Sequence, residues 1–264
     1  MLNFRPILPP NSMKRLLYLL LFLPTVLVGQ INESDSLKLK AKLALTGFWQ
    51  RGNVETSIFR ARTDLSYRPW KKWVFKNQNS YVYQAFGGLR ADEDVLSLNF
   101  LYFNPDRKVY PFILGFGSSS FRREIRLRYL FGAGFTVNVL RKKKDWLKFS
   151  LSSEYEQTDF ERASFNRPVY NDDNSIHTFR ATLWINGKYH LFKDKMVLTH
   201  ESYVQPSLER SDNYRWEAEL NLALPLWKFL DFTINYRQVV ESVVITSQQQ
   251  QDRFLTFGFT VKSY

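Results

Sequence analysis

The chain has 264 residues, of which 44% are hydrophobic and 17% aromatic, and its formal net charge is +12 at pH 7. It contains no cysteine, which excludes a disulfide scaffold, a thiolate metal site and a cysteine nucleophile. The length fits one large all-β domain or two smaller domains, and the composition suits a soluble protein as well as a membrane barrel with a polar interior.

The amino terminus has the layout of a secretory signal peptide. From Met13 it reads MKRLLYLLLFLPTVLVGQ, in which Lys14 and Arg15 precede an apolar run that ends before the small residue Gly29. We therefore expect residues 1–29 to be a signal peptide, with Met13 as the initiator, and residues 30–264 to be the exported domain. The alternative is a membrane-anchor helix, but a run of about thirteen apolar residues is too short to span a bilayer comfortably.

The exported part opens with LKLKAKLALTGFWQRGN, residues 37–53, in which every second residue is apolar. Between the leucines stand Lys38, Lys40 and Lys42. A period of two predicts a strand with two chemically different faces. This strand alone does not show whether the leucine face contacts a protein core or lipid, so the answer has to come from the rest of the chain.

Strands of similar length follow at even spacing, with almost no helical periodicity. Their predicted apolar faces, in chain order, are Phe59, Ala61, Leu65 and Tyr67; Leu96, Leu98, Phe100 and Tyr102; Tyr110, Phe112, Leu114 and Phe116; Ile125, Leu127, Tyr129, Phe131, Ala133, Phe135, Val137 and Val139; Leu147, Phe149, Leu151 and Tyr155; Phe179, Ala181, Leu183 and Ile185; Tyr214, Trp216, Ala218, Leu220, Leu222 and Leu224; Leu230, Phe232, Ile234 and Tyr236; and Leu255, Phe257, Phe259 and Val261. Less regular strands are expected near 73–86 and 196–208. The total of about twelve is even, as bacterial outer-membrane barrels require.

Three features favour lipid over a protein core. Tight connections such as RPWKKW and RKKKDW alternate with long ones at 159–175 and 243–252, as periplasmic turns alternate with external loops. The last segment, FLTFGFTVKSY, is a strand with a terminal aromatic residue, as in many substrates of the barrel-assembly machinery. Aromatic residues also form two groups at the strand ends, which suits two membrane interfaces. Those beside the tight turns are Trp70, Trp73, Tyr102, Tyr110, Trp146, Tyr189, Trp227 and Tyr264, and those toward the other ends are Trp49, Tyr81, Tyr83, Tyr155, Tyr214, Trp216 and Tyr236.

Several stretches resemble one known family. They are GFWQRGNVETSIFRARTDLSYRP from residue 47, RLRYLFGAGFTVNVL at 126–140, and ESYVQPSLERSDNYRWEAELNLALPLWKFLDFTINY at 201–236. They are similar to a bacterial domain-of-unknown-function family typified by salt-induced outer-membrane proteins. The resemblance implies an outer-membrane barrel, and it supplies no activity and no functional residues.

Charged residues alternate with the apolar faces and are expected to line the lumen. The candidates are Arg60, Arg62, Asp64, Arg126, Arg128, Glu154, Glu156, Arg180, Glu217, Glu219 and Arg237. We expect Arg126 and Arg128 to pair with carboxylates such as Glu154 and Glu156, because opposite charges on adjacent strands interact. Such a network either fills the barrel or forms a narrow polar channel. A barrel of about twelve strands lies between filled and open sizes, and we favour the filled or gated form.

The segment THES offers an alternative function. His200 and Ser202 are two residues apart on a predicted strand and so share a face, as in outer-membrane phospholipases. The chemistry needs a third group to hold the histidine tautomer, and Asn213 is the nearest candidate. The sequence lacks the Asn-Gly that follows the serine in that family, so a chance match is favoured over a lipid hydrolase.

The remaining motifs give weaker evidence of function. GFGSSS at 115–120 has no helix after it and so lacks the context of a phosphate-binding loop. RKKKD at 141–145 reads as a solvated turn, and no nucleic-acid partner is expected for an exported chain. The three histidines lack metal-ligand spacing, so neither a metal nor a cofactor is expected.

The sequence therefore predicts an all-β protein, a transmembrane antiparallel β-barrel of about twelve strands in the outer membrane of a Gram-negative bacterium, with both termini in the periplasm. Its predicted function is structural or that of a narrow solute channel, without catalytic activity. The expected partners are outer-membrane lipids and lipopolysaccharide, the barrel-assembly machinery during insertion, and a small solute if the lumen conducts. The oligomeric state stays open.

Overall fold

The computed structural model describes residues 38–52 and 55–261. The predicted signal peptide and the terminal Tyr264 lie outside these residues. The strands are β1 (Leu39–Gln50), β2 (Thr56–Trp70), β3 (Trp73–Phe86), β4 (Leu89–Phe103), β5 (Val109–Ser120), β6 (Ile125–Arg141), β7 (Trp146–Phe160), β8 (Ser175–Leu191), β9 (Met196–Pro206), β10 (Tyr214–Trp227), β11 (Leu230–Glu241) and β12 (Gln251–Val261), with a 3-10 turn η1 (Pro168–Tyr170) between β7 and β8.

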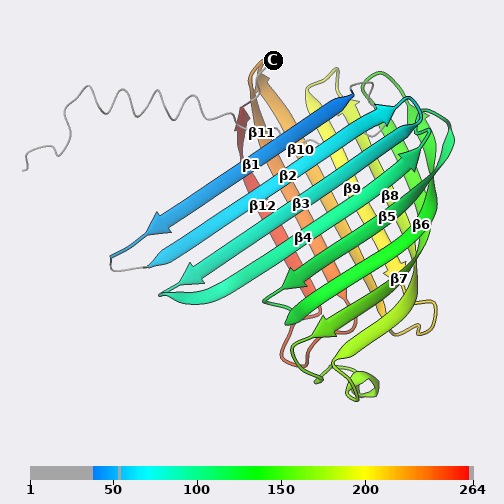
Figure 1. Cartoon of the computed structure of the whole chain (residues 1–264). Helices are drawn as coiled ribbons and strands as arrows, with labels where there is room; N and C mark the ends of the chain where they lie inside the picture. Colours follow the sequence, from blue (N-terminus) through cyan, green and yellow to red (C-terminus); the bar gives the residue numbers. More distant parts are fainter. Residues whose placement is uncertain (1–37, 53–54, 262–264) are drawn as a thin grey trace, which may run out of the picture.

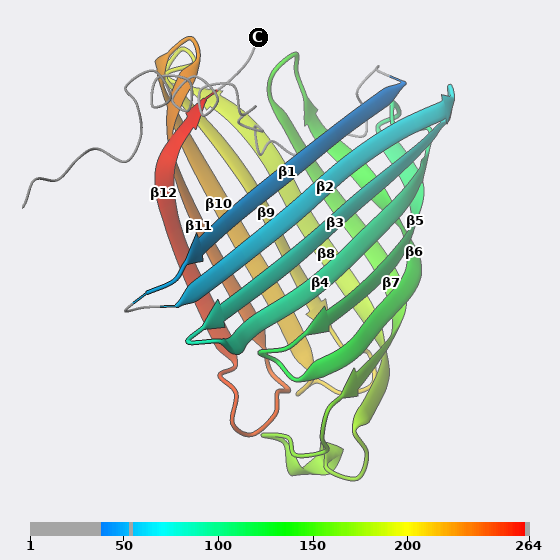
Figure 2. The ribbon, with the colours of Figure 1, turned by 60° about the vertical axis from the view of Figure 1, so that its left-hand side comes forward.

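All twelve strands belong to one antiparallel sheet, in which each strand is hydrogen-bonded to its neighbours in sequence. The sheet rolls up into a tilted, barrel-shaped shell (Figures 1 and 2). This confirms the predicted all-β antiparallel barrel of about twelve strands. Among the described residues, no helix is long and apolar enough to cross a membrane.

The two ends of the barrel differ as the alternation of turns predicts. One, the turn end, has the short connections 71–72, 104–108, 142–145, 192–195 and 228–229. The other, the loop end, has the longer connections 161–174, 207–213 and 242–250, and it lies at the bottom of Figure 1. It also has short connections at 87–88 and 121–124, so the predicted difference holds for the strands from β7 to β12. Because the number of strands is even, the start of β1 and the end of β12 both lie at the turn end.

The outer face of the sheet is mainly apolar and exposed. On β6, the residues Leu127, Tyr129, Phe131 and Phe135 alternate with buried or half-buried ones, as predicted. On β12, Leu255, Phe257 and Phe259 are all about two-thirds exposed or more, at 65%, 71% and 68%. A globular protein buries such residues, so this sheet has its apolar and polar sides reversed.

The predicted faces of β4 and β5 are wrong. Phe100 and Tyr102 of β4, and Tyr110, Phe112 and Leu114 of β5, were expected to face outward, but they are buried in a cluster inside the barrel. Tyr102 and Tyr110 therefore do not belong to an outer aromatic belt. The reason is that both faces of these strands hold apolar or small residues, so a period of two identifies the faces without telling which is inside.

The beginning of β6 also departs from the prediction. Ile125 was expected on the outer face, but it is buried against Phe160, Phe165 and Ile176 at the loop end. The register between β6 and β7 shifts between Ile125 and Leu127. A bulge of this kind sends the residues before it to the opposite face.

The two edge strands of the sheet are not hydrogen-bonded to each other. Within the described residues, β1 pairs with β2 and β12 pairs with β11, and the sheet order runs from β1 to β12 without closing. The seam between them lies at the left of Figure 2.

Candidate functional site

A cluster of buried ions crosses the barrel near the loop end, with Glu156 of β7 at its centre. Glu156 is 2% exposed and accepts a hydrogen bond from Arg180 Nε of β8 at 2.7 Å. Arg215 of β10 also donates to it through Nη2. Thr158 Oγ1 donates to the same carboxylate at 3.0 Å. Charge-assisted bonds of this kind are stronger than neutral ones, and here they join three strands.

Arg128 extends this cluster across the lumen. It lies on β6, yet its Nη1 and Nη2 donate to the two carboxylate oxygens of Glu241 on β11 at 3.0 and 2.9 Å. It also lies 3.9 Å from Glu156. Strands β6 and β11 are five places apart in the sheet, so this pair spans the interior rather than following a wall. We call the group Arg128, Glu156, Arg180, Arg215 and Glu241 the ionic plug.

Loops cover the plug from outside. Phe165 of the 161–174 loop forms a bridge to Ile245 of the 242–250 loop, and both residues are buried. A second contact fixes the first loop, because Arg162 donates from Nε and Nη2 to Glu124, at 2.6 and 2.8 Å. These bonds hold the pKa of the Glu124 carboxyl below its ordinary value. The loop end is therefore closed over β6 to β11.

An apolar bridge crosses the lumen on the side of the plug that faces the turn end. The ring of Trp184 on β8 packs edge-on against Phe100 of β4, with centroids 5.6 Å apart. Trp184 also contacts Tyr203 of β9 edge-on, at 5.9 Å. Phe100 belongs to the interior cluster of β3, β4 and β5. Four strand positions separate β4 from β8, so this aromatic bridge also spans the interior.

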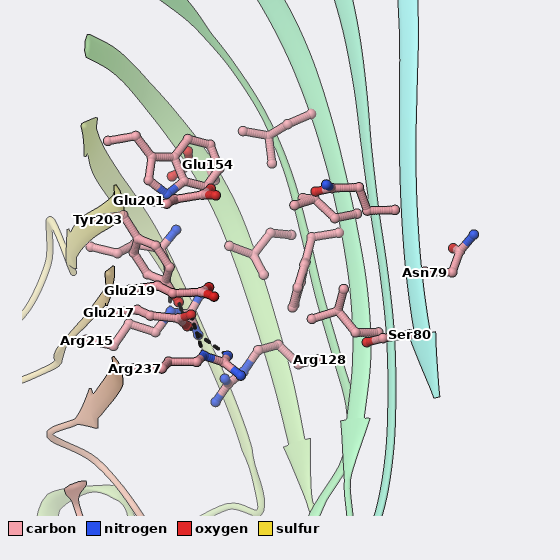
Figure 3. A pocket seen from close by; sticks show the side chains of 18 of the residues that line it. Asn79, Ser80, Arg128, Glu154, Glu201, Tyr203, Arg215, Glu217, Glu219 and Arg237 are labelled. Atoms are coloured by element: carbon pink, nitrogen blue, oxygen red, sulfur yellow. Dashed lines mark hydrogen bonds and ion pairs between the residues drawn. The ribbon is translucent and has the colours of Figure 1, made fainter. Parts of the chain in front are cut away.

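A cavity of about 290 Å³ lies in the lumen beside these two crossings (Figure 3). Charged residues line one part of it, and Trp184, Tyr203, Leu98 and Leu114 line another. The charged lining residues are Arg62, Arg128, Glu154, Glu201, Arg215, Glu217, Glu219 and Arg237. The cavity is large enough for a few waters or a small polar molecule.

Most of the predicted lumen residues lie around this cavity or in the plug. Glu154 is buried and accepts bonds from Ser152 and from Thr182, the latter at 2.8 Å. Arg237 donates to both oxygens of Glu217, at 2.7 and 3.1 Å. Asn235 donates to Glu219 at 2.8 Å.

Three predicted residues, Arg60, Asp64 and Arg126, belong neither to the cavity lining nor to the plug. Arg126 is 62% exposed at the loop end and lies 3.9 Å from Asp159, so it does not join Glu154 or Glu156. Arg60 is exposed on β2. Arg62, two residues further along β2, lies 3.3 Å from Asp64.

Sequence reasoning missed Arg215, Glu241, Glu201 and Tyr203. Arg215 is in phase with Glu217 and Glu219, so the alternation could have found it. The sequence gives no clear alternation through VVES, so it does not show that β11 continues to Glu241. Glu201 is directly opposite Glu219 in the register of β9 and β10, a pairing that only the structure defines.

The pair His200 and Ser202 lies on the outer face of β9, as predicted, but the candidate third group, Asn213, does not lie beside it. His200 stacks on Tyr189 of β8, whose hydroxyl lies 3.4 Å from Nε2. Asn213 is inside the barrel, where its Oδ1 accepts a bond from Arg180 at 2.8 Å. It therefore does not orient the imidazole. In the part of the chain that the structure describes, no group of three His, Asp or Glu residues is arranged to hold a metal ion.

Of the comparisons with known proteins, one identifies the family and none identifies an activity. The profile of a family described as "Protein of unknown function, DUF481" matches residues 43–262. No curated protein matches the chain. Among solved structures, one titled "NanC porin structure in rhombohedral crystal form" is similar with a TM-score of 0.47 and 12% identity, over 84% of this chain and 100% of that one.

Proposed function

Since this chain belongs to the DUF481 family, whose function is unknown, we propose a function from its own two faces: it is a β-barrel of the bacterial outer membrane that holds its lumen closed and admits small solutes only through a narrow, gated passage. The single observation that carries this is the reversal of sides, with apolar residues outside and paired charges inside.

The reversal supports a lipid environment for physical reasons. A strand crosses a bilayer only if its backbone groups are paired, and here every strand between β2 and β11 is paired on both sides. Exposure of the outward residues Leu127, Phe131 and Phe257 to water would be unfavourable, and their transfer into hydrocarbon would be favourable. Trp70, Trp73 and Trp227 are exposed beside the tight turns, where indole rings suit a membrane interface.

The orientation and the partners follow from this proposal. The short turns, the start of β1 and the end of β12 would face the periplasm, and the long loops would face outward. Membrane lipids and lipopolysaccharide would cover the outer face, and the barrel-assembly machinery would insert the chain.

The two crossings of the lumen support gating rather than a permanently open pore. A solute entering from the loop end meets the ionic plug, and one entering from the turn end meets the aromatic bridge between β4 and β8. Buried pairs such as Arg128 with Glu241 are stable only while both partners are present. Passage would therefore require the plug residues to rearrange.

The membrane location is tested by fractionation. The protein should be found in the outer-membrane fraction and should migrate faster on a gel before boiling than after, because a folded barrel resists detergent. A protein that stays soluble in the periplasm and shows no mobility change on heating would overturn the proposal.

The gate is tested with two arginines of the same strand. Purified wild-type protein in planar bilayers should show low conductance, and Arg128→Ala should raise it several-fold because Glu241 loses its bidentate partner. The matched control is Arg126→Ala, at the exposed rim, which should behave as the wild type does. Glu241→Gln, which keeps the shape of the side chain, gives a second route to the same opening. If both plug variants are folded and conduct as the wild type does, the lumen is not gated there.

A further inference from the structure

Five polar residues on the outer face of β2, β3 and β4 form a connected group far from either rim. Thr63 on β2, Asn77 and Asn79 on β3, and Ser97 and Asn99 on β4 are joined side chain to side chain. We call these five residues the asparagine patch.

The register shows that the asparagine patch faces outward. Asn79 pairs with Thr63 on one side and with Ser97 on the other, and Asn77 pairs with Asn99. Gln78, Asn79 and Ser80 all border the cavity, but alternate residues of a strand point their side chains to opposite faces. In Figure 3 Ser80 points toward the cavity and Asn79 points away from it.

Hydrogen bonds connect the side chains of the patch, and two of them are short. Asn77 Nδ2 donates to Asn99 Oδ1 at 2.7 Å and Asn79 Nδ2 donates to Asn77 Oδ1 at 2.6 Å. Asn79 Nδ2 also donates to Thr63 Oγ1 at 3.0 Å, and Asn99 Nδ2 donates to Ser97 Oγ at 3.1 Å. These bonds reduce the cost of placing amides in an apolar medium. They do not use the full capacity of three carboxamides, each of which can take part in four hydrogen bonds.

The patch lies midway between two aromatic pairs. Trp73 and Phe103 pack against each other toward the turn end, with tilted rings whose centroids are 4.9 Å apart. Phe59 and Tyr81 pack toward the loop end at 6.1 Å. Aromatic side chains of this kind mark the two membrane interfaces, so in the proposed membrane orientation the amides are near the middle of the hydrocarbon. Polar side chains there are costly when lipid surrounds them.

We propose that the asparagine patch is the interface through which two copies of this chain associate side by side in the membrane. The proposal rests on the proposed outer-membrane location. A second copy fits because the patch carries no charge, and each carboxamide offers both donors and an acceptor. A two-fold axis places the same surface on both sides, and only a self-complementary surface satisfies that arrangement.

The neighbouring strand allows close approach. Gly115 and Gly117 of β5 pair with Asn99 and Ser97, and the space where their Cβ atoms would lie is open for at least 4 Å. Small residues next to polar ones let membrane-embedded surfaces come close enough to hydrogen-bond.

The chain has no cysteine, so single-cysteine variants give an unambiguous test. Asn79→Cys should form a disulfide-linked species of twice the mass when membranes are treated with an oxidant. Leu151→Cys on the outward face of β7, where Leu151 is 43% exposed, is the matched control and should not. Adding Asn77→Leu and Asn99→Leu to Asn79→Cys should reduce the cross-linked fraction at least fivefold, while the mobility shift on heating is retained.

Three results would overturn the proposal: equal cross-linking of the two cysteine variants, cross-linking of Asn79→Cys to a protein of another mass, or no cross-linking of a barrel that still shows the heat shift. A protein without the heat shift would overturn the membrane location itself, and the interface with it.

Discussion

Glu156 is the residue on which the ionic plug depends. Two arginines of other strands donate to its carboxylate, and it is almost fully buried. Glu156→Gln keeps the size of the side chain but leaves buried positive charge without its anion. We expect the free energy of unfolding to fall by about 3 kcal/mol, the usual cost of breaking a buried pair. Equilibrium urea unfolding in detergent micelles measures this change.

Glu217→Gln is the matched control for that experiment. Glu217 also binds an arginine, but the side chain of Arg237 is 44% exposed, so water takes over part of the interaction. The expected loss is below about 1 kcal/mol. Equal losses in the two variants would mean that burial does not set the strength of these pairs.

At the scale of single residues, the sequence predicts which face of the sheet a side chain lies on better than it predicts its ion-pair partner. Alternation indicates that Arg128 and Glu156 share a face with the lumen charges, and both are buried. It also led to Arg126 being grouped with Arg128, because a bulge between Ile125 and Leu127 leaves no mark in the residue pattern. The partner of Arg128 is Glu241, on a strand whose end was not recognised.

Strand β6 approaches β7 closely at Gly132 and Gly134, which have no Cβ atoms. A Cβ at Gly134 would lie 2.2 Å from the carbonyl oxygen of Leu151 and 2.7 Å from the Cα of Ser152, so the backbone would have to move. We expect Gly134→Ala to lower the free energy of unfolding by about 1–3 kcal/mol, as overpacking does. Urea unfolding measures it.

Gly258→Ala on β12 is the control for this experiment. It tests whether the loss of stability comes from the close contact with β7 or from replacing any glycine of the sheet. Nothing lies within 4 Å of the Cβ it would add. The change should stay within about 0.5 kcal/mol of the wild type. A large loss at Gly258, or none at Gly134, would contradict the steric explanation.

At the scale of elements, spacing and turns were predictable because they depend on local chemistry. The less regular strands expected near 73–86 and 196–208 are β3 and β9. The faces of β4 and β5 were not predictable, because Phe100 and Phe112 pack inside while Val95 and Ile113 are exposed outside. Periodicity separates apolar from polar faces, and these strands have little polar face to recognise.

At the scale of the molecule, the contacts that close the lumen could not be read from the sequence. Neighbouring strands follow from chain order, but the pairs Arg128 with Glu241 and Phe100 with Trp184 depend on how the sheet curves. Curvature arises from twist, bulges and glycines together. The charges that fill the lumen were therefore predictable as a set, and their connections were not.

The long reach of Arg128 has a consequence for how the protein is made. Arg128 and Glu241 are 113 residues apart in the chain, and Arg123 and Asp252 are 129 apart. Hairpins between consecutive strands close short loops and can form early, whereas these two contacts can form only after β11 and β12 are in place. A nascent chain that lacks β11 and β12 has the three arginines of the plug and Glu156, but it lacks Glu241, the partner of Arg128. Completion of the plug is thus a late folding event, because it requires the hairpin of β11 and β12 to have joined the sheet.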